Sequence, residues 1–508
     1  MKDYLKIGKA SELIGRDRKI YRLLEIIPGF LSLGTLLLLL ILSYFKPVWM
    51  AYFIIAFDVY WLLLVIYLSI LLVTAHLAMK KNLKINWRAE CQNLLWQDIY
   101  HLIIFPAYNE SIEIIMASFQ GLLDDGYPAD KMIVVLAIEA RAGEEALANA
   151  KIIEQEYGNK FKKFLITFHP DNIAGELRGK GANQTWAAKE VKEKIIDKEG
   201  YDYNNILVSV FDIDTVVFPG YFFCLTNKFL TTTNPYRASY QPVPVYHNNI
   251  WQAHFFARVA AVSNTFWQMM QQIRQEKLAT YSSHSMTWKA LIDIGFWSTN
   301  TVSDDSRIFW HCFFYYKGDY RVEPLYFPVS MDVCMDENIQ QTIKNLYKQQ
   351  RRWGWGVENV PYLIFNLIKN HKDLPVQKTI NHILVQIYGF HSWATNALII
   401  GVIGWMPMII GGDKFNVMVL SNNLPATTKL LMTASMVGLI FSAVISSLLL
   451  PKRPVGYGFS KNIVMFLQWL ILPFGIIIFG CLPGLEAQTR LMLGKYMGFW
   501  VTPKKRIS

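Results

Sequence analysis

Five stretches between residues 102 and 170 alternate between two patterns, and this alternation decides the fold. The first, third and fifth are short, apolar and β-type, whereas the second and fourth have a helical pattern. In chain order they are LIIFPAYNE (102–110), SIEIIMASFQGLL (111–123), KMIVVLAIEA (131–140), GEEALANAKIIEQEYG (143–158) and FLITFHP (164–170). Strand, helix, strand, helix, strand is typical of a parallel α/β sheet. Because such sheets bind ligands at the carboxyl ends of their strands, we expect the chemistry just after these runs.

Long apolar runs flank this region on both sides. Two precede it, at residues 26–45 and 49–79, and each can cross a ~30 Å hydrocarbon core, which takes about 20 helical residues. Lys and Arg residues precede the first run and follow the second, so the positive-inside rule places both flanks in the cytoplasm. We therefore predict a multi-pass integral protein of the plasma or inner membrane, with its α/β domain cytoplasmic.

Three further apolar runs follow, at residues 383–410, 430–450 and 463–482, and the sequence ends in a basic tail. Three crossings would leave this tail outside, although its charge favours the cytoplasm. Either the last run re-enters the membrane around Pro473 and Pro483, or another run hides an extra turn. The number of C-terminal helices is therefore three or four.

The composition fits a protein that is part membrane and part globular. Of the 508 residues, 53% are hydrophobic and 18% charged, too apolar for an ordinary soluble enzyme and too charged for a pure helical bundle in lipid. The net charge of +11 suits anionic lipid, phosphorylated substrates or nucleic acid. Dispersed basic residues argue against a nucleic-acid partner. The five cysteines are scattered without a CxxC pair, which indicates neither a disulfide framework nor a zinc site.

The stretch SVFDIDTVVFPGYF (209–222) places two acids at the end of an apolar strand. Residues two apart in a strand point the same way, so Asp212 and Asp214 face one side. Their charges repel unless a cation lies between them. Mg²⁺ or Mn²⁺, bound by one or two carboxylates and a substrate diphosphate, would supply that cation. The alternative is a solvated loop whose acids cap the next helix.

The glycine-rich stretch GELRGKGANQTWAAKE (175–190) contains Lys180 at a turn that opens a helix. The lysine could bind a phosphate there, or the turn could be a plain helix start. A P-loop is rejected, because Gly175 and Gly179 are one residue too close and Gly181 stands where Ser or Thr is needed.

Two more stretches each allow more than one interpretation. In NTVSDDSRIFWHCFFYYKG (300–318), Asp304 and Asp305 begin an apolar helix, either as an N-terminal cap or with one of them as a general base. The stretch YKQQRRWGWGVE (347–358) gathers cations and indole rings ahead of membrane sequence. It could be a membrane-surface anchor, a nucleic-acid patch or part of an active site.

The order of these motifs is more specific than any one of them. FPAYNE (105–110), DID (212–214), SDD (303–305) and QQRRW (349–353) follow one another at wide spacings between membrane segments. This set resembles the membrane-embedded family 2 glycosyltransferases, the group that contains cellulose, chitin and hyaluronan synthases. The resemblance covers roughly residues 99–360 and the flanking helices.

The resemblance implies a GT-A-type nucleotide-sugar domain, an α/β fold with a Rossmann-like, mostly parallel sheet, inserted between transmembrane α-helices. The expected parts are an N-terminal segment with two transmembrane helices (1–85), the catalytic domain (86–338), amphipathic interface helices carrying QxxRW (339–380), C-terminal transmembrane helices (381–484) and a basic tail (485–508).

The resemblance also implies roles for individual residues. Asp212 and Asp214 would hold the Mg²⁺ or Mn²⁺ ion, and Asp305, with Asp304 beside it, would take the proton from the acceptor hydroxyl. The donor nucleotide and its diphosphate would contact Pro106, Ala107, Asn109, Glu110, Glu139, Lys180, Asn183 and Arg352, and the acceptor would contact Gln349 and Trp353. Displacement at an anomeric carbon needs such a base and a positive charge on the leaving group.

The sequence departs from the family pattern in three places, one of which is the GWGVE stretch after Trp353, with a second tryptophan, Trp355, and two glycines at the acceptor mouth. Glu139 follows the second strand where the family has an aspartate, and Ser303-Asp304-Asp305 replaces T-E-D. The expected function is inverting transfer from a nucleotide sugar, a UDP-sugar, to a growing polysaccharide at the cytosolic membrane face. The alternatives are a non-processive enzyme that adds one sugar to a lipid-linked or short acceptor, and a membrane transporter with a cytosolic domain.

Overall fold

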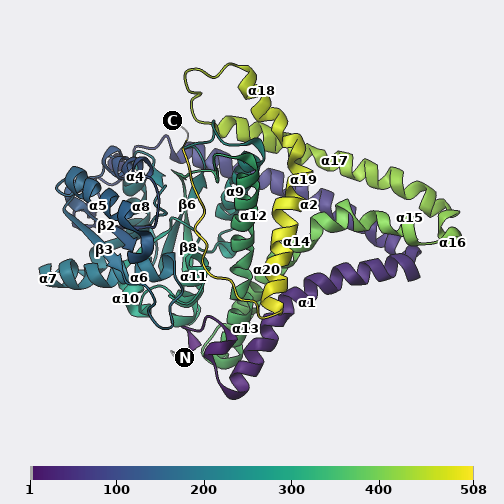
Figure 1. Cartoon of the computed structure of the whole chain (residues 1–508), viewed down its shortest axis with the longest axis horizontal. Helices are drawn as coiled ribbons and strands as arrows, with labels where there is room; N and C mark the ends of the chain where they lie inside the picture. Colours follow the sequence, from purple (N-terminus) through teal and green to yellow (C-terminus); the bar gives the residue numbers. More distant parts are fainter. Residues whose placement is uncertain (1–3, 507–508) are drawn as a thin grey trace.

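The computed structural model, which describes residues 4–506, joins an α/β domain to long helices that project from one side of it (Figure 1). Within these residues the domain contains an eight-stranded sheet in the order β3-β2-β1-β4-β7-β6-β8-β5. The strands are β1 (Tyr100–Ala107), β2 (Met132–Glu139), β3 (Lys163–His169), β4 (Ile206–Val210), β5 (Val216–Val217), β6 (Ala238–Val245), β7 (Ser285–Thr287) and β8 (Arg321–Ser330).

The sheet is mixed but mostly parallel, as the alternating sequence pattern predicts. Strands β3, β2, β1 and β4 are parallel neighbours, and β6 is parallel to β8. Strand β7 is antiparallel to β4 and β6, and β5 is antiparallel to β8. The carboxyl ends of β1, β2 and β4 therefore meet at one edge of the sheet, where parallel strands place their ligand sites.

Helices cover both faces of the sheet and bury its apolar side chains. The helices on one face are α4 (Ile112–Asp124), α5 (Glu144–Tyr157) and α8 (Tyr221–Thr231), and those on the other are α6 (Lys180–Val191), α10 (Trp288–Ile294) and α11 (Asp304–Tyr315). Two short helices, α3 (Trp87–Glu90) and α7 (Asp197–Glu199), lie in the connections. The predicted helices at residues 111–123 and 143–158 are α4 and α5.

Three amphipathic helices lie between the sheet and the long helices. They are α9 (Phe255–Ile273), α12 (Ile339–Gly354) and α13 (Asn359–Asn370). The QQRRW motif forms the end of α12, and the 3₁₀ turn Trp355–Glu358 connects it directly to α13.

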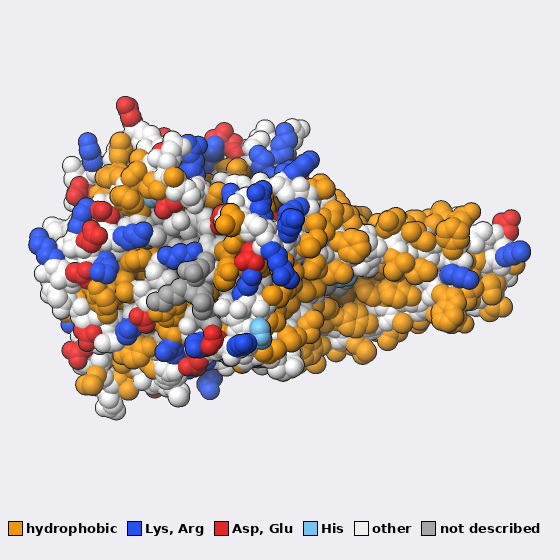
Figure 2. Space-filling view, turned by 90° about the horizontal axis from the view of Figure 1, so that it is seen from below, with side chains coloured by type: hydrophobic (Ala, Val, Ile, Leu, Met, Phe, Trp, Pro, Cys, Tyr) orange, Lys and Arg blue, Asp and Glu red, His pale blue; other side chains and the backbone are white. Residues whose placement is uncertain are grey.

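Among residues 4–506, five helical segments are long and apolar enough to cross a membrane. They are α1 (Gly15–Phe45), α2 (Pro47–Asn82), α14 (Val376–Gly401), α17 (Val419–Leu449) and the segmented helix Ser460–Met492, which comprises α18 (Ser460–Leu467), α19 (Leu472–Ile476) and α20 (Leu482–Met492). Figure 2 shows hydrophobic side chains over the projecting helices, whereas charged side chains gather on the α/β domain and at the far tip. The tip contains α15 (Met406–Ile410) and α16 (Asp413–Asn416).

The segment Ser460–Met492 begins and ends beside the α/β domain. In α18, Met465 packs in a cluster with Trp251 and Val333 of that domain. In α20, Glu486 pairs with Arg351 of α12 at 2.6 Å. The segment runs across α1 in Figure 1 rather than alongside it. The segment is one continuous, segmented helix and not a hairpin around Pro473 and Pro483, and the choice between three and four C-terminal crossings stays a prediction.

We expect α1, α2, α14 and α17 to cross the membrane and Ser460–Met492 to lie at its catalytic-domain face. Single cysteines replacing exposed Arg453 and Lys495 should then react with an impermeant maleimide from the same side of sealed vesicles. A cysteine at the exposed tip residue Lys414 should react from the opposite side. The five natural cysteines are buried, so the wild-type protein gives the background. Labelling of the Arg453 and Lys495 positions from opposite sides would mean that the segment crosses.

Candidate active site

Four of the predicted site residues lie at the carboxyl edge of the sheet and come from three elements. Asp212 and Asp214 follow β4, Lys180 is the first residue of α6, and Asp305 lies in the first turn of α11. Gly179 allows the chain to turn into α6, because its φ of +141° lies in the region that side chains avoid. The separate motifs of the sequence thus become one cluster.

Lys180 is the centre of this cluster. Its ammonium group donates to Oδ1 of Asp212 at 2.7 Å and to Oδ1 of Asp305 at 2.7 Å. Burial works against the charge on Lys180, but the two carboxylates outweigh it and raise the pKa of the lysine. Burial alone would likewise raise the pKa of Asp212, yet Lys180 and Lys504 hold it below its usual value. Lys180 therefore helps to hold Asp212 in its ionised form and links it to Asp305 through its hydrogen bonds.

Asp304 and Asp305 are adjacent but have different surroundings. Asp304 is buried and accepts a hydrogen bond from the Gln184 side chain at 3.0 Å. Burial and the neighbouring Asp305 charge raise the pKa of Asp304 to about 8. The Asp305 side chain is 24% exposed, so an acceptor hydroxyl can reach it. Of the two acids, Asp305 has the geometry of a base.

Asp214 is fully buried and contacts a segment that the sequence did not link to the site. Its Oδ1 accepts a hydrogen bond from Lys504, and its Oδ2 accepts one from the backbone N–H of Asp332 at 2.8 Å. Arg506 pairs with Asp332 at 2.9 Å. The C-terminal tail, residues 493–506, therefore contacts the carboxylate cluster; it is the thin yellow trace without regular structure in Figure 1.

The same tail covers Arg352. The guanidinium carbon lies 4.9 Å from the centre of the Phe499 ring, and Phe499 also packs on Gly179, where a Cβ would come within 2.5 Å of it. Arg352 is near enough to Asp304 to lower its pKa, although burial dominates. Gln349 and Trp353 lie one helical turn apart on α12, so both belong to the face that carries Arg352.

Four of the predicted donor residues lie at or just after the end of β1. Pro106 and Ala107 end the strand, Asn109 is exposed, and the Glu110 carboxylate accepts a hydrogen bond from the Tyr108 N–H at 2.8 Å. Burial raises the pKa of Glu110, and the Lys504 ammonium opposes this effect. Glu110 is therefore close to the tail lysine.

Two of the predicted donor residues are occupied by contacts within the protein. Glu139 pairs with Arg141 at 2.7 Å, and Arg141 stacks on Tyr108 with its guanidinium carbon 4.4 Å from the ring centre. Asn183 donates to the carbonyl of Ala137 in β2 at 2.7 Å and is buried. In this structure Asn183 joins α6 to the sheet, and Arg141 with Tyr108 forms a flat surface near the end of β2.

A divalent cation fits the two acids only under one condition. All four carboxylate oxygens of Asp212 and Asp214 have protein donors: Lys180 and Ser282 for the first, Lys504 and the Asp332 N–H for the second. Within residues 4–506 no group of three or more His, Cys, Asp or Glu side chains is arranged to hold a metal. The ammonium of Lys504 shows that Asp214 favours a cation. A divalent ion fits where Lys504 withdraws and a substrate diphosphate completes the ligands.

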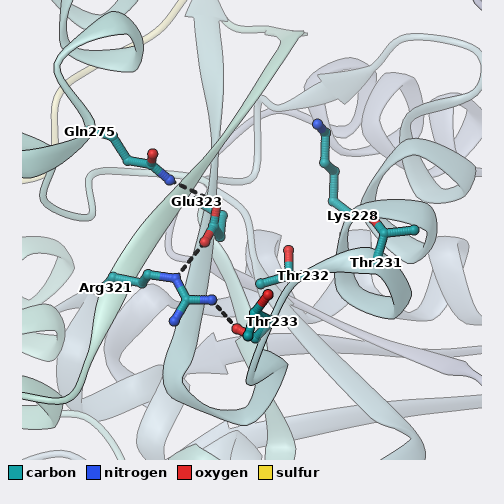
Figure 3. Close-up of a pocket in the computed structure, with 7 residues that line it drawn as sticks. All are labelled: Lys228, Thr231, Thr232, Thr233, Gln275, Arg321 and Glu323. Carbon is teal, nitrogen blue, oxygen red and sulfur yellow. Dashed lines mark hydrogen bonds and ion pairs between the residues drawn. The ribbon is translucent and has the colours of Figure 1, made fainter.

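A hollow lies at the opposite edge of the sheet, near the start of β8 (Figure 3). Its cation Arg321 already pairs with Glu323 at 2.5 Å and donates to the carbonyl of Thr233. Gln275 also donates to Glu323, at 2.8 Å. This hollow is remote from the motifs and has no comparable charge cluster.

Several functional residues were missed by the sequence interpretation. Ser282 and Gln184 hold Asp212 and Asp304, and Lys504 and Arg506 bring positive charge from the end of the chain. The basic tail was visible in the sequence, but nothing in a linear pattern pairs Lys504 with an acid 290 residues earlier.

The family model for glycosyl transferase family group 2 matches residues 207–478, more than half of the chain and including DID, SDD and QQRRW. The chain belongs to this family, and its activity class is sugar transfer from a nucleotide-sugar donor. The sheet and its helices are accordingly the expected GT-A-type domain, flanked by membrane helices.

Solved structures with a similar arrangement are distant in sequence. The mannosyltransferase PcManGT from Pyrobaculum calidifontis in complex with GDP-Man and Mn²⁺ is 12% identical over 87% of this chain and 100% of its own, with a TM-score of 0.43. S. aureus TarS 1-349 in complex with UDP-GlcNAc is 12% identical over 69% of this chain and 91% of its own, with a TM-score of 0.36. No curated protein matches the sequence.

We expect Asp304→Asn to reduce the pH dependence of stability between about pH 4 and pH 8. An aspartate in the unfolded chain has a pKa of about 3.9, whereas burial raises the pKa of Asp304 in the folded protein to about 8. In this window the native state binds a proton that the unfolded state lacks, so wild-type stability falls as pH rises. The melting temperature in detergent should drop between pH 5 and pH 8 by about 2 °C or more beyond the drop of the variant. Equal decreases in melting temperature for the wild type and the variant would contradict a raised pKa of Asp304.

Proposed function

We propose that this protein is an inverting family 2 glycosyltransferase that extends a polysaccharide with sugars from a UDP-sugar at the cytosolic face of the membrane. The observation that carries this proposal is the Lys180 ammonium, which joins Asp212 and Asp305 at the carboxyl edge of the sheet with Arg352 nearby. In this proposal Asp305 is the base, Lys180 and Arg352 are the two cations, and Asp212 and Asp304 are the neighbouring acids of one reaction centre.

The donor diphosphate would lie between the start of α6 and α12. Lys180 and Arg352 would neutralise the charge that develops on the departing nucleotide, since a preorganised cation stabilises a leaving oxyanion. Arginine suits this task because its planar fork matches phosphate oxygens. Pro106, Ala107, Asn109 and Glu110 would line the nucleotide side, together with the Tyr108–Arg141–Glu139 stack.

Donor binding would also prepare the base. Lys180 is shared between Asp212 and Asp305 at equal distances of 2.7 Å, and a diphosphate would attract the ammonium away from Asp305. The freed Asp305 carboxylate takes the proton of the acceptor hydroxyl. At the same time the hydroxyl oxygen of the acceptor forms the new bond to the anomeric carbon. The bond from that carbon to the nucleotide diphosphate breaks on the opposite face, which inverts the configuration. This step needs no carboxylate nucleophile, unlike that of a retaining glycosidase.

The ion Mg²⁺ or Mn²⁺ would be held by Asp214 and Asp212, and when bound it would supply positive charge to the diphosphate. Lys504 competes for this place because its ammonium contacts Asp214. The tail would therefore leave Asp214 when the ion and donor bind.

The acceptor would lie along α12, where Trp353 offers an apolar face for a sugar ring and Gln349 a polar group. This helix packs against the membrane segment through the Arg351–Glu486 pair at 2.6 Å, which favours an acceptor at the membrane surface. A growing glycan and a lipid-linked or short acceptor both satisfy this geometry. The length of the product separates them.

Purified protein incubated with labelled UDP-, GDP- and other nucleotide sugars should transfer one of them, and the products should be sized. A ladder of long chains is expected for the polysaccharide synthase, whereas one added sugar would support the single-addition enzyme. Asp305→Asn should lower transfer by about 100-fold or more and leave donor binding within two-fold, because general-base catalysis contributes about 10²–10⁴-fold. Near-normal turnover by this variant would remove Asp305 as the base.

Competition between Lys504 and the divalent ion can be measured without transfer. Lys504→Met should bind Mn²⁺ at least three-fold more tightly than the wild type in a titration followed by electron paramagnetic resonance, with UDP present to supply the diphosphate. Asp214→Asn should lose this binding. Lys505→Met is the matched control, because Lys505 is a neighbouring exposed lysine that pairs with Glu337 at 2.9 Å instead. Equal Mn²⁺ affinities for the two lysine variants would contradict the competition, and chelator-insensitive transfer would contradict the metal.

A further inference from the structure

Glu358, in the GWGVE turn after the QQRRW motif, is a buried carboxylate with four hydrogen-bond donors. Its Oε1 accepts from the backbone N–H groups of Val302 at 3.1 Å and Ser303 at 2.9 Å, and from the Ser303 hydroxyl at 2.6 Å. Its Oε2 accepts from the indole N–H of Trp355 at 2.8 Å. The side chain is 6% exposed, so these donors replace the water that a carboxylate otherwise needs.

The first three donors fix the start of α11. Ser303 immediately precedes Asp304 and Asp305, and its hydroxyl bonds to Glu358 instead of capping its own helix. The next turn is attached to the same region, because Arg307 donates to Asn359 Oδ1 at 2.7 Å and to the Glu358 carbonyl at 3.2 Å. The start of α11, which carries Asp305, is therefore anchored to the segment that follows Trp353.

The fourth donor fixes the end of α12. Trp355 lies three residues after Arg352 and is buried in an apolar cluster with Val302 and Ala487. The glycines on either side allow close packing. A Cβ on Gly354 would lie 3.2 Å from the Gly484 Cα of α20, and one on Gly356 would lie 3.2 Å from Phe390 of α14. The helix end that bears Arg352 is thereby held against two neighbours.

We propose that Glu358 is a positioning residue that sets the spacing between Asp305 and Arg352. Trp355 supports this role by donating a hydrogen bond to the Glu358 carboxylate. This inference rests on the proposed roles of Asp305 and Arg352. One carboxylate joins the segment of the base to the segment of the leaving-group cation, which act on opposite sides of the anomeric carbon. Misplacement of such groups by about 1 Å can cost about 10²-fold in rate.

The test compares Glu358→Gln with Asp125→Asn in the full-length protein. Glutamine preserves the volume and the acceptor for Ser303 but turns an N–H₂ group toward the Trp355 N–H, so it breaks one contact and removes the charge. Asp125 is a matched control: it is also buried and accepts backbone N–H groups, from Tyr127 at 3.2 Å and Phe222 at 3.3 Å, at the start of α8 away from the site. Both variants should lower the melting temperature.

Only Glu358→Gln should change the reaction. We expect its kcat per folded molecule to fall at least ten-fold and the acid limb of its kcat–pH profile to move by at least half a pH unit. Its dissociation constant for the free nucleotide should stay within two-fold, and Trp355→Phe should reproduce part of the kcat loss. Wild-type kcat and pH profile in Glu358→Gln, or a loss matched by weaker nucleotide binding, would overturn the proposal. Asp305→Asn in the same assay tests the proposed function separately, because only its near-normal turnover removes the base.

Discussion

Positive charge from distant parts of the chain makes a buried cluster of carboxylates possible at the end of β4, and the rest of the site depends on this balance. A buried carboxylate without a cation or hydrogen-bond donors is strongly disfavoured, and removal of one partner of a buried pair costs about 3–5 kcal/mol. Lys180 from α6 contacts Asp212 and Asp305, and Lys504 from the tail contacts Asp214. The start of α6, the start of α11 and the C-terminal tail are therefore placed by one electrostatic constraint.

The same balance determines what substrate binding must change. A nucleotide diphosphate adds negative charge to a site whose cations already have partners, so those cations must be redistributed. Lys180 can move its contact from Asp305 to a phosphate, and Lys504 can yield Asp214 to a divalent ion, which replaces one positive charge with two. Asp304 adds little negative charge to the site at neutral pH, because burial and its charged neighbour raise its pKa to about 8. Under the proposed function, binding of the donor and activation of Asp305 as the base would be parts of one rearrangement.

The sequence predicted the local elements of the fold well because their signals are local. Hydrophobic alternation identified β1 to β3 with α4 and α5, and glycine and acid placement identified the starts of α6 and α11. The motif order predicted the family, and the structure brings Lys180, Asp212 and Asp305 into contact. What the sequence could not predict depends on long-range contact. The tail lysine meets Asp214 from 290 residues away, and Ser460–Met492 is long and apolar enough to cross a membrane although both of its ends contact the catalytic side.

The stretch YKQQRRWGWGVE shows why composition alone misleads. Cations and indoles ahead of membrane sequence suggest a surface anchor. In the structure, however, three residues of this stretch face three different parts of the protein. Arg351 pairs with Glu486 beside the membrane segment, Arg352 faces Phe499 and the carboxylates, and Trp355 is buried in the core. Glu358 accepts hydrogen bonds from Ser303 and Trp355 and so connects the stretch to the start of α11, where Asp305 lies. Because a helix presents successive residues about 100° apart, one short segment can contact the membrane side, the donor side and the core at once. The mixed composition is therefore the consequence of a helix end placed where these three regions meet.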